Sequence, residues 1–73
     1  MKRDFKGIHN DIIGAAIDNY VNGRHAVRNR ALLKDAMIDG LCYETIAEKY
    51  DLSVRRVQDI VYEYEDLIYY KVK

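Results

Sequence analysis

The feature that most constrains the fold is the scarcity of helix-breaking residues. The 73-residue chain contains no proline and only four glycines, so long stretches carry nothing that interrupts an intrahelical hydrogen-bond ladder. Apolar residues recur along these stretches at intervals of three and four, which is the period of an amphipathic helix. The sequence therefore predicts an all-α fold, a small bundle of about four helices in a single domain.

The helices are predicted over residues 11–22, from 24 or 25 to 39, over 43–50, and from the residue after Ser53 onward. Asn10 or Asp11 is expected to cap the first helix, while Asn22-Gly23 and Gly40 are expected to stop the first and the second. The apolar stripes are Ile12, Ile13, Ala16, Ile17, Tyr20 and Val21 on the first helix, and Val27, Ala31, Leu32 or Leu33, Ala36, Met37 and Ile38 on the second.

The C-terminal part of the chain is compatible with two structures. Residues 60–72 are rich in Tyr, Val and Ile, and the alternation over 61–65 suits a terminal β-strand of the kind found in winged helices. The helical pattern persists through Ile68, so we expect a helix, with residues 66–73 open between helix, strand and tail. The expected organisation is a tail at 1–10, two scaffold helices over 11–39, a helix pair over 43–62 and a helical extension or tail over 63–73.

Composition excludes several classes of protein. Twelve basic residues balance twelve acidic ones, which excludes a globally basic nucleic-acid binder but allows a segregated basic patch. One cysteine excludes an internal disulfide framework and a multi-cysteine zinc site, and we expect no metal and no cofactor. No catalytic residue set is recognisable, so we do not expect an enzyme. There is no apolar run of about 18 residues, and residues 1–7 lack a signal-peptide core, which predicts a cytoplasmic protein without a membrane partner.

The most informative segment is YETIAEKYDLSVRRVQDIVY, residues 43–62. Two short helices that cross steeply need a small residue where they touch, and Ala47 supplies it. Leu52 is an apolar residue in the turn, and Ser53 is a good N-cap for the second helix. The apolar residues expected to face the core are Ile46, Tyr50, Val57 and Ile60. This spacing is typical of a helix-turn-helix.

Residues 40–64 resemble the helix-turn-helix superfamily of transcription proteins, and are most similar to region 4 of bacterial sigma factors and related phage or mobile-element activators. In those families a Gly-Leu-Ser-Tyr-Glu-Glu-Ile-Ala run precedes the turn, and Ser-x-x-Thr-Val follows it; here the segment reads GLCYETIAEKYDLSVRRVQDIV. Asp51 stands where glycine is commonest, which predicts a left-handed backbone at that residue. Cys42 stands where a serine N-cap is usual, and Arg56 where threonine is common.

The resemblance implies sequence-specific binding of double-stranded DNA by a small transcriptional regulator, with the second helix of the motif in the major groove. Arg55 is then expected to bond guanine, Gln58 to bond adenine and Val54 to touch a thymine methyl group. Asp59 is expected either to accept from a cytosine amine or to orient Arg55 or Arg56. The predicted base-reading residues are Val54, Arg55, Gln58, Asp59 and Tyr62.

Phosphate contacts are predicted at two places. No acidic residue occurs between positions 19 and 34, and the second helix is expected to carry one basic surface there. Its members are Arg24, Arg28, Arg30 and Lys34, with His25 among them. Thr45, Ser53 and Arg56 are expected to contact phosphates beside the reading helix. The acidic run at 63–66 is expected to be solvated and to face away from DNA.

Apolar residues near the C-terminus predict a partner. The expected interface residues are Tyr64, Leu67, Ile68, Tyr69 and Tyr70, and a homodimer is the expected assembly. The alternative is a protein-interaction module on a helix-turn-helix scaffold, which binds RNA polymerase or another regulator and has little affinity for DNA. An excision or recombination accessory factor would use the same DNA chemistry as a repressor or activator.

Overall fold

The computed structural model describes Phe5 and residues 7–72, and this part of the chain forms four helices and no strand. They are α1 (Asn10–Tyr20), α2 (Ala26–Met37), α3 (Tyr43–Tyr50) and α4 (Val54–Val72). The all-α prediction is confirmed, and the competing terminal strand is wrong because the helical hydrogen-bond ladder continues to the end of α4. The predictions for residues 1–7 and for residue 73 fall largely outside the described residues.

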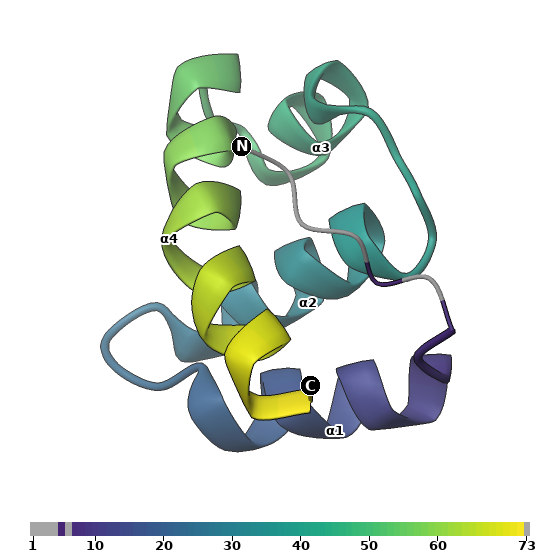
Figure 1. Ribbon diagram of the computed structural model, residues 1–73. Helices are drawn as coiled ribbons and strands as arrows, with labels where there is room; N and C mark the ends of the chain where they lie inside the picture. Colours follow the sequence, from purple (N-terminus) through teal and green to yellow (C-terminus); the bar gives the residue numbers. More distant parts are fainter. Residues whose placement is uncertain (1–4, 6, 73) are drawn as a thin grey trace.

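The helices pack around α4, which runs the length of the bundle (Figure 1). α3 packs against the start of α4 and α1 against its end, while α2 lies between α1 and α3 and contacts all three other helices. The buried apolar core draws on every helix and consists of Ile13, Ala16, Ile17, Val21, Leu32, Leu33, Ile46, Ala47, Val57, Ile60, Val61 and Ile68. Since one face of α4 is committed to this core, its opposite face is fixed toward solvent.

Helix α1 differs from its prediction at both ends. His9 is the N-cap, with Nδ1 accepting a 3.2 Å hydrogen bond from the backbone N–H of Asp11, so the predicted caps at 10 and 11 are wrong. The helix ends at Tyr20 because Val21 turns extended and buries its side chain in the core. The apolar face is also narrower than predicted, since Ile12 and Tyr20 are exposed.

The apolar face of α2 is confirmed in its C-terminal half, where Leu32 and Leu33 are buried, but not in its first half. Val27 is 83% exposed and Ala31 is also exposed, although both were expected in the apolar stripe. Val27 precedes Leu32 by five residues, and residues five apart do not share a helix face. The buried polar residues of α2 are Asn29 and Asp35. Beyond the helix, Gly40 has a φ of +72° and occupies the predicted stop position.

The connection from α3 to α4 is three residues long and held by local hydrogen bonds. Asp51 is left-handed at φ 56° and ψ 49°, as predicted. The N–H of Leu52 donates to the carbonyl of Ala47 at 2.9 Å. The hydroxyl oxygen of Ser53 accepts from the N–H of Arg56 at 3.0 Å, which confirms the predicted cap. Together these bonds fix where α4 begins relative to α3.

More side chains in the C-terminal half of α4 pack within the molecule than the sequence predicted. Ile68 is fully buried, so its assignment to a partner interface is wrong. The ring of Tyr69 packs edge-on against Phe5, with centroids 5.4 Å apart, and Lys71 Nζ lies 5.1 Å from the centre of the Tyr20 ring. Glu65 is only 2% exposed, which contradicts the expectation that the whole acidic run is solvated.

None of the helices described here is long and apolar enough to cross a lipid bilayer.

Candidate nucleic-acid interface

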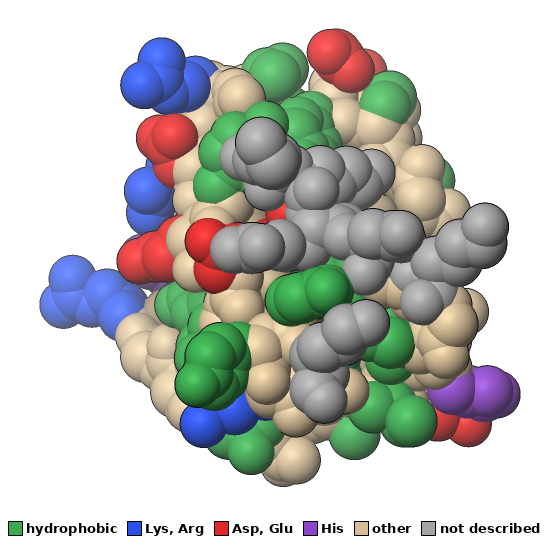
Figure 2. All heavy atoms as spheres, in the orientation of Figure 1, with side chains coloured by type: hydrophobic (Ala, Val, Ile, Leu, Met, Phe, Trp, Pro, Cys, Tyr) green, Lys and Arg blue, Asp and Glu red, His purple; other side chains and the backbone are tan. Residues whose placement is uncertain are grey.

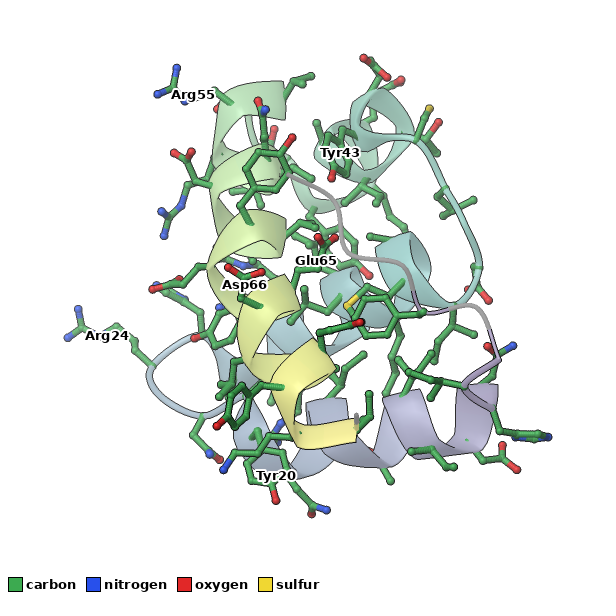
Figure 3. All side chains as sticks on the ribbon, viewed as in Figure 1. Tyr20, Arg24, Tyr43, Arg55, Glu65 and Asp66 are labelled. Carbon is green, nitrogen blue, oxygen red and sulfur yellow. The ribbon has the colours of Figure 1, made fainter. Side chains whose placement is uncertain are left out.

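The first turns of α4 present an exposed stripe opposite the core. Val57, Ile60 and Val61 are buried on the inner side of the helix, so the helical period turns the intervening positions outward. The Arg55 side chain is 83% exposed, and Figure 3 shows it projecting away from the bundle. The stripe consists of Val54, Arg55, Gln58, Asp59 and Tyr62, all exposed except Gln58, which is half-buried. The five predicted base-reading residues therefore lie together on one surface.

Two hydrogen-bonded pairs order the side chains of this stripe. Nε of Arg55 lies 3.4 Å from Oδ1 of Asp59. Nε2 of Gln58 donates to the hydroxyl oxygen of Tyr62 at 3.2 Å. Each pair is separated by four residues, the spacing at which side chains meet on a helix. The polar groups thus point along the stripe in defined directions.

An open hollow of about 510 Å³ lies beside the start of α2. Its basic lining residues are Arg24, His25 and Arg28, and the others are Gly23, Ala26, Val27, Ala31 and Tyr50. Because Tyr50 is the last residue of α3, the hollow lies next to the connection that leads into α4. Arg24 projects from the loop between α1 and α2, toward the same side of the view as Arg55 (Figure 3).

The predicted basic surface of the second helix is divided between two sides of α2. Arg24 and Arg28 line the hollow. Arg30 instead donates from Nε to the carbonyl of Val21 at 2.8 Å and from Nη2 to Oδ1 of Asn22 at 3.1 Å. Nζ of Lys34 lies 2.8 Å from a carboxylate oxygen of Asp18. Since Arg30 and Lys34 bind residues of α1 and its C-terminal loop, the single basic surface predicted from the sequence does not form.

The remaining predicted phosphate contacts come from α3 and from the start of α4. The guanidinium group of Arg56, like that of Arg24, makes no hydrogen bond or ion pair with any residue the structure describes, and both residues are exposed. Ser53 uses its oxygen as an acceptor for the cap, which leaves its O–H as a donor. The Thr45 hydroxyl lies 3.1 Å from Sγ of Cys42. Arg56 and Ser53 therefore lie at the start of α4, whereas Thr45 lies in the first turn of α3.

Charge along α4 changes sign after its second turn. Glu63 and Asp66 are exposed and follow Asp59 at the spacing that continues the same helix face. Figure 2 shows basic and acidic side chains alternating along the edge of the molecule beside α4. A phosphate backbone would be attracted to the first turns and repelled by the later ones. Along α4, a polyanion would therefore be attracted only to the N-terminal end of the helix.

The buried carboxylate of Asp35 binds the tyrosine that lines the hollow. Oδ2 of Asp35 accepts from Tyr50 Oη at 2.6 Å and from Lys49 Nζ at 2.9 Å. Burial, with the hydrogen bond to Asp35, raises the pKa of Tyr50, and the same carboxylate raises the pKa of Lys49. Burial also raises the pKa of Tyr43 on α3, and the neighbouring Tyr62 and Glu65 add to the effect. At neutral pH the three groups keep their protons.

Neither a protein-family model, nor a curated protein, nor a solved structure matches the chain. Function is therefore inferred from the residues and their geometry. Among the described residues, no three His, Cys, Asp or Glu side chains gather in a way that could hold a metal ion.

Sequence reasoning missed that Tyr50 and Val27 line the hollow. Val27 was expected to face inward and is exposed, whereas Tyr50 packs against the core as expected and also borders the hollow. The five-residue separation of Val27 from Leu32 was the available signal for its exposure. For Tyr50 the signal was its position as the last residue before the turn.

Proposed function

We propose that the chain binds double-stranded DNA in the major groove with the first turns of α4, and acts as a small transcriptional regulator in the cytoplasm. In this proposal α3 and α4 form a helix-turn-helix. The observation that carries it is the exposed stripe on α4, which starts with Arg55 and is fixed outward by a buried opposite face. A helix of about 10 to 12 Å in diameter fits the major groove, whose width is about 12 Å.

The stripe offers the chemistry that base edges require. A guanidinium group can donate to both acceptors of guanine, and a carboxamide can pair with adenine through one donor and one acceptor. Arg55 and Gln58 supply these groups, and Val54 supplies a methyl-bearing side chain beside them. Base contacts of this kind would give the protein its sequence preference.

Phosphate contacts would come from the groups that flank the stripe. Arg24 and Arg28 line the hollow beside α3, and Arg56 and Ser53 lie at the start of α4. Thr45 is exposed on α3. Because the protein has no net charge, these few contacts would give a modest dependence of affinity on salt.

We further propose that two copies of the chain bind together. A monomer with so few phosphate contacts would bind weakly, and two recognition helices would double the contacts with DNA. Leu67 and Tyr70 are the exposed apolar residues near the end of α4, with Tyr70 81% exposed. They are the part of the predicted interface, together with half-buried Tyr64, that could contact a second copy.

The test is binding-site selection from random DNA, followed by fluorescence anisotropy on the selected duplex. Arg55→Ala and Gln58→Ala should each weaken binding about 5- to 150-fold, because a bidentate base contact contributes about 1–3 kcal/mol. Lys71→Ala removes an equal charge at the far end of α4 and should leave affinity within about twofold. If both stripe variants bind the selected duplex like the wild type, the proposal fails.

A protein-interaction module that binds RNA polymerase or another regulator is the second candidate. It is favoured by the zero net charge and by the exposed acidic residues Glu63 and Asp66 on the face that carries Arg55. The two functions respond differently to salt. Binding to DNA should weaken measurably as salt rises from about 50 to 200 mM, because each phosphate contact releases counterions, whereas association through apolar contacts should hardly change.

A further inference from the structure

We propose that Asp59 and Tyr62 are positioning residues, which hold Arg55 and Gln58 so that α4 addresses a guanine and an adenine on neighbouring base pairs. The inference rests on the proposed function. For Asp59 it selects one of the two expected roles, that of orienting an arginine, and for Tyr62 it replaces the expected direct base contact. The inference depends on two hydrogen-bonded pairs within α4, Arg55 with Asp59 and Gln58 with Tyr62.

The pair of Arg55 with Asp59 leaves the two terminal nitrogens of the guanidinium available. Asp59 lies against Nε of Arg55 at 3.4 Å, so the two terminal nitrogens remain for the two acceptors of guanine. An arginine side chain loses up to about 2 kcal/mol of rotamer entropy when it is ordered. A side chain that is already held before binding loses less of it on DNA, which favours the correct base.

The second pair holds the carboxamide of Gln58 beside the phenol of Tyr62. Nε2 of Gln58 donates one hydrogen to Tyr62 Oη at 3.2 Å. Its second hydrogen and Oε1 bond to no residue that the structure describes, and adenine pairing needs one donor and one acceptor from the amide. Gln58 is half-buried, so the amide has less freedom to flip than a fully exposed side chain. With the phenol oxygen as its acceptor, the amide keeps one donor and one acceptor for adenine.

The spacing of the two pairs sets the spacing of the bases. Positions 55 and 58 are three residues apart, which is about 4.5 Å along a helix axis. Successive base pairs are about 3.4 Å apart. Two side chains at this separation on a helix lying along the groove meet adjacent base pairs. The selected site should contain the guanine and the adenine without an intervening base pair.

The experiment is a double-mutant cycle on the selected duplex and on duplexes in which the guanine or the adenine is replaced. Asp59→Ala should lower the preference for guanine at least about threefold, the scale of coupling between neighbouring side chains, and should have no further effect in the Arg55→Ala background. Tyr62→Phe should lower the preference for adenine in the same way and have no effect beside Gln58→Ala. All variants should keep their thermal unfolding midpoint.

Matched controls remove the same groups elsewhere. Glu63→Ala deletes a carboxylate one turn later on α4, and Tyr20→Phe deletes the hydroxyl of an exposed tyrosine on α1. Both should leave base preference unchanged, although Glu63→Ala should raise affinity for every sequence alike, because it removes a charge that repels phosphate.

Three results would overturn the assignment. If the effects of Asp59→Ala and Arg55→Ala multiply, Asp59 contacts DNA independently. If Tyr62→Phe leaves the adenine preference intact, the phenol does not position the amide. If the two bases are separated by a base pair, the register is wrong. A selection that yields no preferred sequence overturns the proposed function as well as this inference.

Discussion

The hydroxyl of Tyr50 donates a 2.6 Å hydrogen bond to Oδ2 of Asp35, and this bond ties the last residue of α3 to the last turn of α2. Asp35 is 7% exposed, so the donors that reach it replace the water that the carboxylate loses. Because Tyr50 directly precedes the turn into α4, the same bond helps to fix where the exposed stripe of α4 begins.

Asp35→Ala should therefore destabilise the protein. The substitution leaves the Tyr50 hydroxyl without its acceptor in a half-buried position, and the expected loss is about 1–3 kcal/mol in the free energy of unfolding. Urea denaturation followed by circular dichroism measures it. The control is Asp39→Ala, which removes an exposed carboxylate and should change stability by no more than about 0.5 kcal/mol. Equal stabilities of the two variants would contradict this role of Asp35.

Stability should fall as the pH rises above about 10. The pKa values of Tyr43 and Tyr50 are raised from 10.0, and that of Lys49 from 10.5. In the pH range between the unfolded and the folded pKa values, the folded state binds more protons, so the free energy of unfolding decreases with pH. The contribution is complete below about pH 10 and is lost above it.

Thermal unfolding between pH 8 and 11 measures this loss. Replacing both Tyr43 and Tyr50 by phenylalanine should flatten the decline, whereas Tyr70→Phe, at an exposed tyrosine, should leave it as in the wild type. A decline of the same slope in all variants would show that these two phenols do not cause it.

Gly14→Ala should stabilise the protein. A methyl group at this position in α1 would meet Cδ1 of Ile38 at 3.6 Å, an ordinary van der Waals contact. Alanine is favoured over glycine within a helix by about 1 kcal/mol, which corresponds to a rise in melting temperature of about 4–8 °C for a domain of this size. Gly40→Ala should lower the melting temperature, because Gly40 has a φ of +72°. A fall for Gly14→Ala would mean that the helix crossing is tighter than described.

Replacing Arg24 and Arg30 one at a time should show that Arg24 acts in DNA binding and Arg30 in stability. Arg24→Ala should leave the melting temperature unchanged, weaken DNA binding for all sequences and reduce the salt slope by about one. Arg30→Ala should instead destabilise the fold by about 1–3 kcal/mol, because it removes the hydrogen bonds to Val21 and Asn22. Anisotropy titrations at several salt concentrations, combined with thermal unfolding, measure both effects. If Arg24→Ala lowered the melting temperature as much as Arg30→Ala, this division of roles would be wrong.

Two neighbouring residues of α4 should respond in opposite ways to truncation. Ile68 is fully buried and Leu67 is 37% exposed. Ile68→Ala should cost about 2–5 kcal/mol of stability, while Leu67→Ala should cost little in the monomer and weaken the proposed dimer. Sedimentation equilibrium measures the association, and denaturation measures the stability. A monomeric wild type at high concentration would exclude the homodimer.

Local features of this protein were predictable because they depend on residues within one turn of each other. The left-handed Asp51, the cap at Ser53 and the bounds of α3 follow from short-range hydrogen bonds and backbone preferences. The exposed stripe from Val54 to Tyr62 follows from helical periodicity alone, once the buried face of α4 is known. Sequence reasoning therefore located the candidate reading surface and the helix that carries it.

The contacts between helices were decided by tertiary structure. Burial of Ile68 and Glu65, exposure of Val27 and the use of Arg30 and Lys34 against α1 all depend on which helix packs on which face. A helical period shows that two residues share a face, but it does not show what covers that face. The same physical reason explains the hollow beside Tyr50, which exists only because α2 and the end of α3 are brought together.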